Sequence, residues 1–328
     1  MTKKRVLSGI RATGRLHLGN YLGAVKGMLA LQENDEFETF YMVVDLHTLT
    51  TPYEPKKLRK SVNEVVLDYL AIGIDPEKSA IFIQSDAPEH IELAYLFSTV
   101  ISVARLSHLP TYKEKVKQFP NSVNMALLNY PVLMAADILA YKAAVVPVGI
   151  DQEPHLEIAR EIARKMNSIY GLKFPEPKRF ITKGGYTPSL TGQGKMSKSV
   201  VGSSIELTDS LETIKEKLAK TPTDGGKGKE VPEKGGVAVL LSLVELFEDK
   251  EKRKDYEKKY LGEGIKYSEL KENLAEAIFE ELKPIQKRRK VFENDQNKVD
   301  EILKKGAEKA RKVAKETLNE VKNAMGII

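Results

Sequence analysis

The chain has 328 residues, of which 41% are hydrophobic and 30% charged, a composition typical of a globular protein large enough for two domains. Its lack of cysteine excludes disulfides, thiolate metal sites and cysteine nucleophiles, and its five histidines show no metal-ligand spacing, so we expect no protein-bound structural metal. A net charge of +6 favours a polyanionic partner, and no apolar run approaches the roughly 18 residues of a membrane span. The apolar run after the basic start stops at Ser8-Gly9 and cannot form the core of a signal peptide, so we expect a cytoplasmic protein.

Apolar strand patterns alternate with helix-period patterns along the first part of the chain. We expect strands over residues 5–10, 39–44, 80–84 and 145–149, and helices over 18–31, 56–72, 90–106, 125–139 and 154–167. Such alternation predicts an α/β fold with a Rossmann-like, doubly wound parallel sheet. Ligands of these sheets bind at the carboxyl ends of the strands.

The character of the sequence changes after Ile205. Helix-period patterns cover residues 237–247, 268–292 and 299–325, and the last of them carries one apolar stripe that must pack against another surface. Glycine, serine, threonine and lysine crowd together between residues 182 and 204, which indicates an exposed loop. The sequence therefore predicts a catalytic domain over 1–205 and a C-terminal α-helical domain over 206–328.

The first loop, residues 8–20, lies between a predicted strand and a predicted helix. A glycine-bearing loop that leads into a helix offers backbone N–H groups and a positive dipole end to a phosphate. His17 and Asn20 add polar groups near the start of the helix, and Gly19 leaves flat space for an adenine ring. The alternative is an ordinary strand-to-helix turn that His17 merely caps.

The second motif is Lys195-Met196-Ser197-Lys198-Ser199, within a glycine-containing stretch. Two lysines and two hydroxyls on a loop suit a triphosphate whose pyrophosphate departs with negative charge. This pentapeptide is the complete KMSKS signature of class I aminoacyl-tRNA synthetases, and residues 17–20, His-Leu-Gly-Asn, resemble their HIGH signature with asparagine in the last place. The residues after the pentapeptide, Val200-Val201-Gly202, depart from the Asp-Pro or Gly-Asn that is frequent in relatives.

The third motif is the predicted helix that contains Tyr130, Met134 and Asp137. Spacings of four and three residues place these side chains on one face, where they form an aromatic-sized pocket with one acceptor. That acceptor suits an indole N–H, which donates but never accepts a hydrogen bond. The alternative is an amphipathic helix with Asp137 on the surface.

Two segments carry a family resemblance: Tyr-Pro-Val-Leu-Met-Ala-Ala-Asp-Ile-Leu, which begins at Tyr130, and Val-Pro-Val-Gly-Ile-Asp-Gln-Glu-Pro-His, which begins at Val146. Both closely resemble the bacterial tryptophanyl-tRNA synthetase family, and the resemblance extends over essentially the whole chain. The resemblance implies catalytic roles for His17, Asn20, Lys195 and Lys198. It implies a tryptophan site formed by Leu7, His47, Tyr130, Met134, Asp137, Val148 and Gln152, in which Asp137 accepts from the indole and Tyr130 with Gln152 holds the α-ammonium. It implies an ATP site formed by Arg11, Ala12, Thr13, Gly19, Asn20, Lys115, Gly149, Ile150, Asp151 and residues 195–199. Arg11 stands where many relatives have glutamine.

The same resemblance implies ATP with Mg²⁺ as cosubstrate, tRNA(Trp) as partner and a homodimer. The dimer would form through an inserted region at about 89–129, the KMSKS loop would span 186–204, and residues 206–328 would bind the anticodon region, with the last helix packing back on the catalytic domain. A basic cluster near the end of a C-terminal helix is expected to meet tRNA phosphates; it consists of Lys283, Lys287, Arg288, Arg289 and Lys290. The alternative for this cluster, and for Lys115 among its neighbouring lysines, is a solvated surface.

Three rival functions share parts of this pattern. A tyrosyl-tRNA synthetase has the same fold and reaction but needs paired polar groups for a phenol hydroxyl. A catalytically idle paralogue that senses tryptophan or nucleotide is disfavoured by the intact His17, Lys195 and Lys198. A helical RNA-binding module without catalysis is disfavoured because the predicted nucleotide fold occupies most of the chain.

Overall fold

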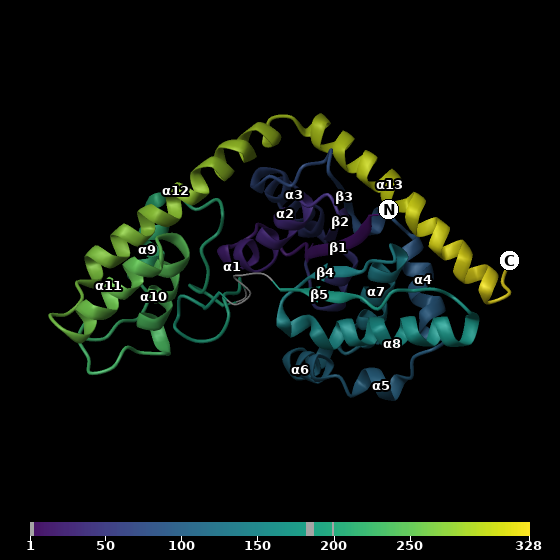
Figure 1. The fold of residues 1–328 in the computed structure, drawn as a ribbon, viewed down its shortest axis with the longest axis horizontal. Coiled ribbons are helices and arrows are strands. Elements are labelled where there is room, and N and C mark those ends of the chain that lie inside the picture. Colours follow the sequence, from purple (N-terminus) through teal and green to yellow (C-terminus); the bar gives the residue numbers. More distant parts are fainter. Residues whose placement is uncertain (1–2, 182–186, 199) are drawn as a thin grey trace. The chain divides into compact units, whose positions relative to one another are not determined.

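The computed structural model describes residues 3–181, 187–198 and 200–328 (Figure 1). Their contacts divide the chain into two compact units. The first unit contains residues 1–14, 24–183 and 292–328, and the second contains residues 15–23 and 184–291. Each unit is therefore assembled from segments that are far apart in the sequence.

A five-stranded parallel sheet forms the centre of the first unit (Figure 1). Its strands are β1 (Lys4–Arg11), β2 (Phe37–Val44), β3 (Ser79–Ile83), β4 (Val145–Pro147) and β5 (Lys178–Phe180), in the order β3-β2-β1-β4-β5. The buried runs within β1 and β2 are typical of parallel strands covered on both faces. Because the winding direction reverses between β1 and β4, the carboxyl ends of these two strands flank the crevice where such sheets bind ligands.

The helices of the first unit cover this sheet. They are α2 (Lys26–Gln32), α3 (Pro55–Ile72), α4 (Glu89–Ser98), α5 (Val103–Ser107), α6 (Pro110–Gln118), α7 (Met125–Ala140), α8 (Glu153–Tyr170) and α13 (Gln296–Ala324). Proline in the first turn and a left-handed glycine at the end set the bounds of α3 and α8: Gly73 has φ 112° and Gly171 has φ 70°. The predicted Rossmann-like fold is thus confirmed.

The prediction of one continuous helix over residues 90–106 is wrong. The chain forms α4 and then α5, and the break ends at Ser102, whose side chain accepts a hydrogen bond from the backbone N–H of Arg105 and so starts a new helix. Two short elements, β5 and α6, were not predicted. β5 has three residues that are exposed or half-buried, and α6 buries none of its residues, so neither carries a hydrophobic period.

The helix expected over residues 18–31 forms in three parts, α1 (Leu18–Asn20), a π-helical turn (Tyr21–Val25) and α2.

The second unit contains α1 and four longer helices. These are α9 (Leu211–Ala219), α10 (Gly235–Phe247), α11 (Lys250–Leu261) and α12 (Tyr267–Glu293), the last of which ends in the first unit. The helices α9 and α11 were not predicted. The second of them, α11, buries only Tyr256 and Tyr260 among many charged residues, so its sequence shows almost no apolar period.

Helix α13 lies along the edge strand β3, where Gly306 meets the strand backbone at Ile81. A Cβ atom at Gly306 would lie 1.8 Å from the carbonyl oxygen of Ile81. The helix can approach so closely only because position 306 has no side chain. An exposed edge strand is a site for unwanted pairing, and α13 covers it.

We expect Gly306→Ala to lower the thermal unfolding midpoint. In an isolated helix, replacing glycine by alanine would stabilise the helix by about 1 kcal/mol. Here the collision with Ile81 forces α13 away from β3, which lowers the free energy of unfolding by about 3 kcal/mol. Gly225→Ala is the control, because a Cβ there meets nothing within 4 Å. A Gly306→Ala protein at least as stable as the parent would contradict the close approach.

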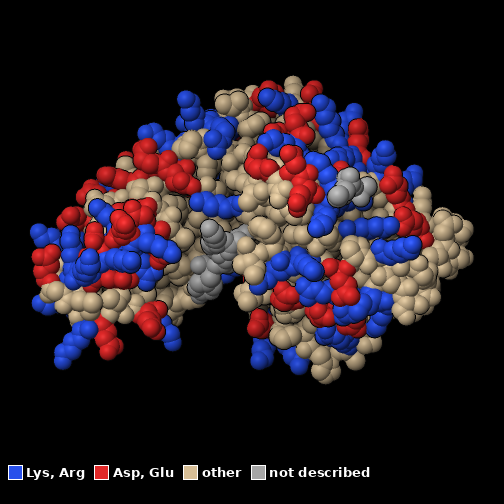
Figure 2. Space-filling model, viewed as in Figure 1, with Lys and Arg blue, Asp and Glu red and all other residues tan. Residues whose placement is uncertain are grey.

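Basic and acidic side chains are interspersed over the described residues on the face shown in Figure 2. The 52 basic and 46 acidic residues of the chain therefore do not give this face a single sign. Binding of a polyanion would depend on local clusters of charge rather than on the field of a whole face. Within the described ranges, no helix combines the length and the apolarity that crossing a membrane requires.

Candidate active site

The carboxyl end of the sheet in the first unit gathers most of the predicted site residues. Arg11 ends β1, His47 lies on a 3₁₀ turn after β2, and α7 carries Tyr130, Met134 and Asp137. Val148 to Gln152 connect β4 to α8 through a second 3₁₀ turn. These segments flank the crevice that the strand order predicts.

Asp137 is 1% exposed, so the alternative of a surface carboxylate is excluded. Its Oδ2 lies 2.9 Å from His47 Nε2, and Gln84 Nε2 donates to both carboxylate oxygens at 2.9 Å. His90 Nδ1 lies 2.9 Å from Oδ1. The carboxylate is therefore surrounded by nitrogen groups of three residues, which come from three different segments.

These neighbours determine the ionisation of Asp137. Burial alone would raise the pKa of the carboxyl group, but hydrogen bonds from His47 and His90, together with their charges, hold its pKa well below the usual range. Asp137 is consequently an anion at neutral pH. A buried anion attracts a hydrogen-bond donor more strongly than a neutral acceptor does.

Sequence reasoning missed Gln84 and His90. His90 is fully buried, and its Nε2 lies 2.7 Å from the hydroxyl of Tyr141, whose ring stacks on Phe40 at 4.7 Å. Gln84 follows β3 directly, so its position at the carboxyl end of a strand was the available signal. His90 opens a helix and carried no comparable signal, because only the fold brings it to α7.

The three residues expected to form the apolar wall of the tryptophan site belong to the apolar core of this unit or pack against it. Leu7 is 2% exposed within the apolar core of this unit, and Met134 and Val148 pack against that core while staying partly exposed. Tyr130 lies beside His47, with ring centroids 6.3 Å apart at 79°. A carboxylate at the base, apolar side walls and a phenol can enclose a flat ring that carries a donor.

Tyr130 and Gln152 are joined by His155. The Tyr130 hydroxyl lies 2.7 Å from His155 Nε2, and His155 Nδ1 lies 3.0 Å from Gln152 Oε1. Burial is the main cause that lowers the pKa of His155 to about 4. His155 was quoted in the family motif but was not predicted as a site residue.

Arg11 and Lys115 place two cations near each other. Arg11 donates from Nη2 to Thr51 Oγ1 at 2.9 Å, while its buried Nε has no hydrogen-bond partner among the described residues. Burial and then the charge of Arg11 lower the pKa of Lys115. Ala12 is buried and Thr13 is exposed, as the next residues of the same loop. Two neighbouring cations with an unpaired N–H suit an anionic ligand.

The two signature segments lie together in the second unit. The backbone N–H of Leu18 donates to the carbonyl of Ile205 at 2.9 Å, and that of Leu207 donates to Leu16 at 3.0 Å. A Cβ atom at Gly19 would lie 3.3 Å from Met196 Cβ and 2.9 Å from His17 Cε1. Position 19 thus favours glycine, because a side chain there would crowd His17 of the same signature and Met196 of the other.

His17 is 7% exposed, and the charges around it fix its state. Burial, then the charges of Lys198 and Lys195, lower its pKa to about 4. Its buried Nδ1 has no hydrogen-bond partner among the described residues, and its backbone N–H donates to Asn20 Oδ1 at 3.2 Å. His17 is therefore neutral near pH 7, with two cations close to it. Ser199, predicted to bind ATP, lies outside the described residues.

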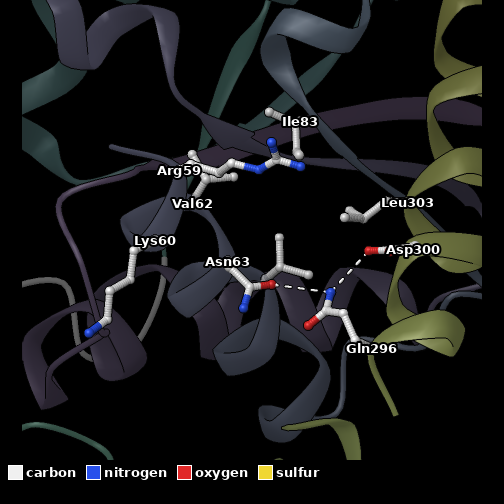
Figure 3. Close-up of a pocket in the computed structure, with 9 residues that line it drawn as sticks. Arg59, Lys60, Val62, Asn63, Ile83, Gln296, Asp300 and Leu303 are labelled. Atoms are coloured by element: carbon white, nitrogen blue, oxygen red, sulfur yellow. Dashed lines mark hydrogen bonds between the residues drawn. The ribbon is translucent and has the colours of Figure 1, made fainter. Parts of the chain in front are cut away.

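A cavity of about 430 Å³ lies elsewhere in the first unit, between α3 and the start of α13 (Figure 3). Gln296 Nε2 donates to Asp300 Oδ1 at 3.0 Å and lies 3.5 Å from Asn63 Oδ1. None of the predicted site residues lines this cavity. Over the described ranges, no three histidine, aspartate or glutamate side chains are grouped to hold a metal ion.

Residues 2–283 match the family of class I tRNA synthetases for tryptophan and tyrosine (W and Y). The tryptophan–tRNA ligase of Clostridium longisporum is 43% identical, covering 100% of this chain and 98% of that protein, and the ligase of Helicobacter pylori strain 26695 is 41% identical, covering both chains completely. Two solved tryptophanyl-tRNA synthetases have the same fold. That of Campylobacter jejuni, complexed with ADP and tryptophan, has a TM-score of 0.84 at 33% identity over 98% of this chain and 99% of its own, and that of Mycoplasma pneumoniae has 0.86 at 31% over 99% and 98%.

The parallel sheet with its switch point and the paired signature segments define a class I aminoacyl-tRNA synthetase. Identity above 40% over the complete chain is more specific than the shared family of tryptophan and tyrosine enzymes. The chain belongs to the tryptophanyl-tRNA synthetase family.

Proposed function

We propose that this protein activates L-tryptophan with ATP and transfers the product to tRNA(Trp). The observation that carries the proposal is Asp137, a buried carboxylate whose pKa is held low, on a helix that packs within the apolar core of the first unit. An indole offers one N–H donor and no acceptor, which matches a carboxylate. Discrimination against tyrosine needs no editing, because a phenol hydroxyl both donates and accepts a hydrogen bond, whereas a carboxylate offers an acceptor alone.

Tryptophan binding displaces part of the network around Asp137. Both of its oxygens already have donors within the chain, so an indole N–H requires one donor to move aside. His47 is 8% exposed, whereas Gln84 and His90 are 0% exposed, so His47 is the donor that moves. Leu7, Met134 and Val148 then line the ring, while Tyr130 and Gln152 hold the α-ammonium.

The ATP-binding residues carried over from the family motifs form two groups, and the members of each group lie within one unit. In the first unit these are Arg11, Ala12, Thr13, Lys115, Gly149, Ile150 and Asp151, and in the second unit they are His17, Gly19, Asn20 and residues 195–199. Mg²⁺ would be carried by the triphosphate and would neutralise part of its charge, so no protein ligand set is assigned to it. Arg11 Nε and His17 Nδ1, both buried and without a hydrogen-bond partner among the described residues, support these assignments, as do the cations near each of them.

The reaction proceeds without a protein nucleophile. A carboxylate oxygen of tryptophan attacks the α-phosphorus of ATP, the bond to the bridging oxygen breaks, and pyrophosphate leaves. A ribose hydroxyl of the terminal adenosine of tRNA then attacks the carbonyl carbon of the adenylate, and AMP leaves. The protein contributes position and charge stabilisation, for which Lys195 and Lys198 supply the mobile cations and His17 a neutral donor.

Two macromolecular contacts belong to this proposal. Lys283, Lys287, Arg288 and Lys290 are exposed on α12 and are suited to tRNA phosphates, but Arg289, expected to join them, is 3% exposed and is corrected to a structural residue. A homodimer is supported by exposed apolar side chains within 89–129, which are Ile91, Tyr95, Val103, Val123 and Met125. Translation takes place in the cytoplasm, so the proposed function implies that location.

The test is ATP–pyrophosphate exchange with purified protein and either tryptophan or tyrosine, followed by charging of tRNA(Trp). We expect exchange that depends on tryptophan and is lower by at least about 10³-fold with tyrosine, since a carboxylate alone leaves the phenol oxygen of tyrosine without a donor. Exchange driven by tyrosine would favour the tyrosyl enzyme. No exchange with either amino acid would favour a sensor.

A further inference from the structure

His155 lies in the first turn of α8 and is 3% exposed. Its two ring nitrogens contact the two side chains proposed to hold the α-ammonium, Tyr130 at 2.7 Å and Gln152 at 3.0 Å. The hydroxyl of Thr111 lies 3.0 Å from the same nitrogen as Tyr130. The imidazole is thus the bridge between two residues that come from different helices.

The contacts determine where the hydrogen of this imidazole lies. Gln152 Nε2 donates to the Asp151 carboxylate at 2.8 Å, so turning the amide over would place oxygen against oxygen. The group that faces His155 is therefore the amide oxygen, which can only accept, and Nδ1 must carry the hydrogen. Burial lowers the pKa of His155 to about 4, so Nε2 is a bare acceptor at neutral pH.

This tautomer fixes the direction of the Tyr130 hydroxyl. A bare Nε2 can only accept, and the Tyr130 hydroxyl at 2.7 Å is closer to it than the Thr111 hydroxyl at 3.0 Å, so we assign the phenol as the donor to His155. Thr111 forms a further hydrogen bond with the phenol oxygen, which leaves that oxygen one free acceptor position. Gln152 Oε1 likewise keeps one free lone pair. Two acceptors without a competing hydrogen remain, and an ammonium group supplies the matching donors.

We propose that His155 is a positioning residue that makes Tyr130 and Gln152 acceptors for the α-ammonium of the substrate, and so selects amino acids over carboxylic acids without the amine. This inference rests on the proposed function. Without the imidazole, the phenol hydrogen is free to turn toward the ammonium, and the amide of Gln152 loses the donor that holds its oxygen in place.

The experiment compares two ligands that differ in the ammonium group alone. Binding of L-tryptophan and of indole-3-propionate is measured by calorimetry for the parent and for His155→Leu. Loss of one oriented hydrogen bond to a charged group is expected to weaken tryptophan about tenfold, and indole-3-propionate less than about twofold. In a Tyr130→Phe background, His155→Leu should change the ratio of the two affinities less, because one of its targets is absent.

His155→Gln is the second variant, because its amide can still accept from Tyr130 while no longer donating to Gln152. We expect this variant to lower the affinity for tryptophan about threefold and to leave the affinity for indole-3-propionate unchanged. The loss is smaller than for His155→Leu because the hydrogen bond from Tyr130 is kept and only the one to Gln152 is lost. Equal weakening of both ligands by either variant would show that His155 only packs, and would overturn the inference. A parent protein that binds no tryptophan would instead contradict the proposed function.

Discussion

Asp137→Ala is expected to abolish the preference for an indole N–H. The substitution removes a buried anion, which is worth about 2–3 kcal/mol against a ring without the donor, so the preference should fall by about 100-fold. The measurement is kcat/KM in pyrophosphate exchange for tryptophan and for its benzothiophene analogue, in which sulfur replaces N–H. Activity with the analogue should change much less than activity with tryptophan.

The same substitution also lowers the free energy of unfolding. It leaves the side chains of Gln84 and His90 buried without their acceptor, at a cost of about 1–3 kcal/mol for each lost partner. Asp137→Asn is the matched variant, because it keeps the shape and one acceptor oxygen but removes the charge. An Asp137→Asn protein that still preferred tryptophan over the analogue to the parental degree would contradict the assigned role.

Lys195→Ala is expected to lower the exchange rate by about 100- to 1000-fold and to leave the choice of amino acid unchanged. A cation that stabilises charge on departing pyrophosphate acts mainly in the transition state, so kcat falls while the tryptophan KM changes little. The nearness of Lys195 to His17, which contributes to the lowered pKa of His17, supports a position beside the first signature.

The control for this prediction is Lys254→Ala on α11, which removes an exposed lysine of the same unit. It should leave both the rate and the KM at the parental values. A Lys195→Ala protein with a parental rate but an altered ratio of tryptophan to tyrosine activation would reverse the roles assigned to Lys195 and Asp137.

The sheet and the larger helices were predictable because their hydrophobic periods are long. Strand β2 and helix α3 each bury a regular set of residues, and the alternation of strands with helices implied the parallel order. The short elements β5 and α6 and the polar α11 carry no such period, and their positions depend on tertiary contacts. The local sequence therefore predicted the elements whose burial is regular and did not predict the others.

The candidate site divides in the same way. The shared face of Tyr130, Met134 and Asp137 followed from helical spacing, whereas the choice against a surface position for Asp137 followed from the family resemblance. The partners His90 and His155 did not, because each reaches its target from another element and no periodicity reports a contact between elements. The basic cluster shows the opposite error, since a run of charges cannot reveal which member, here Arg289, is turned inward.

The pairing of residues 16–18 with residues 205–207 has a consequence for dissecting this protein. Leu16 and Leu18 are almost completely buried in a unit whose remaining residues begin at position 184. A clone that starts at residue 184 or 206 would lack these two side chains, and one that stops at residue 205 would lack α13, which seals the edge of the sheet. Limited proteolysis followed by separation of fragments should therefore yield associated pieces rather than two independently folding halves.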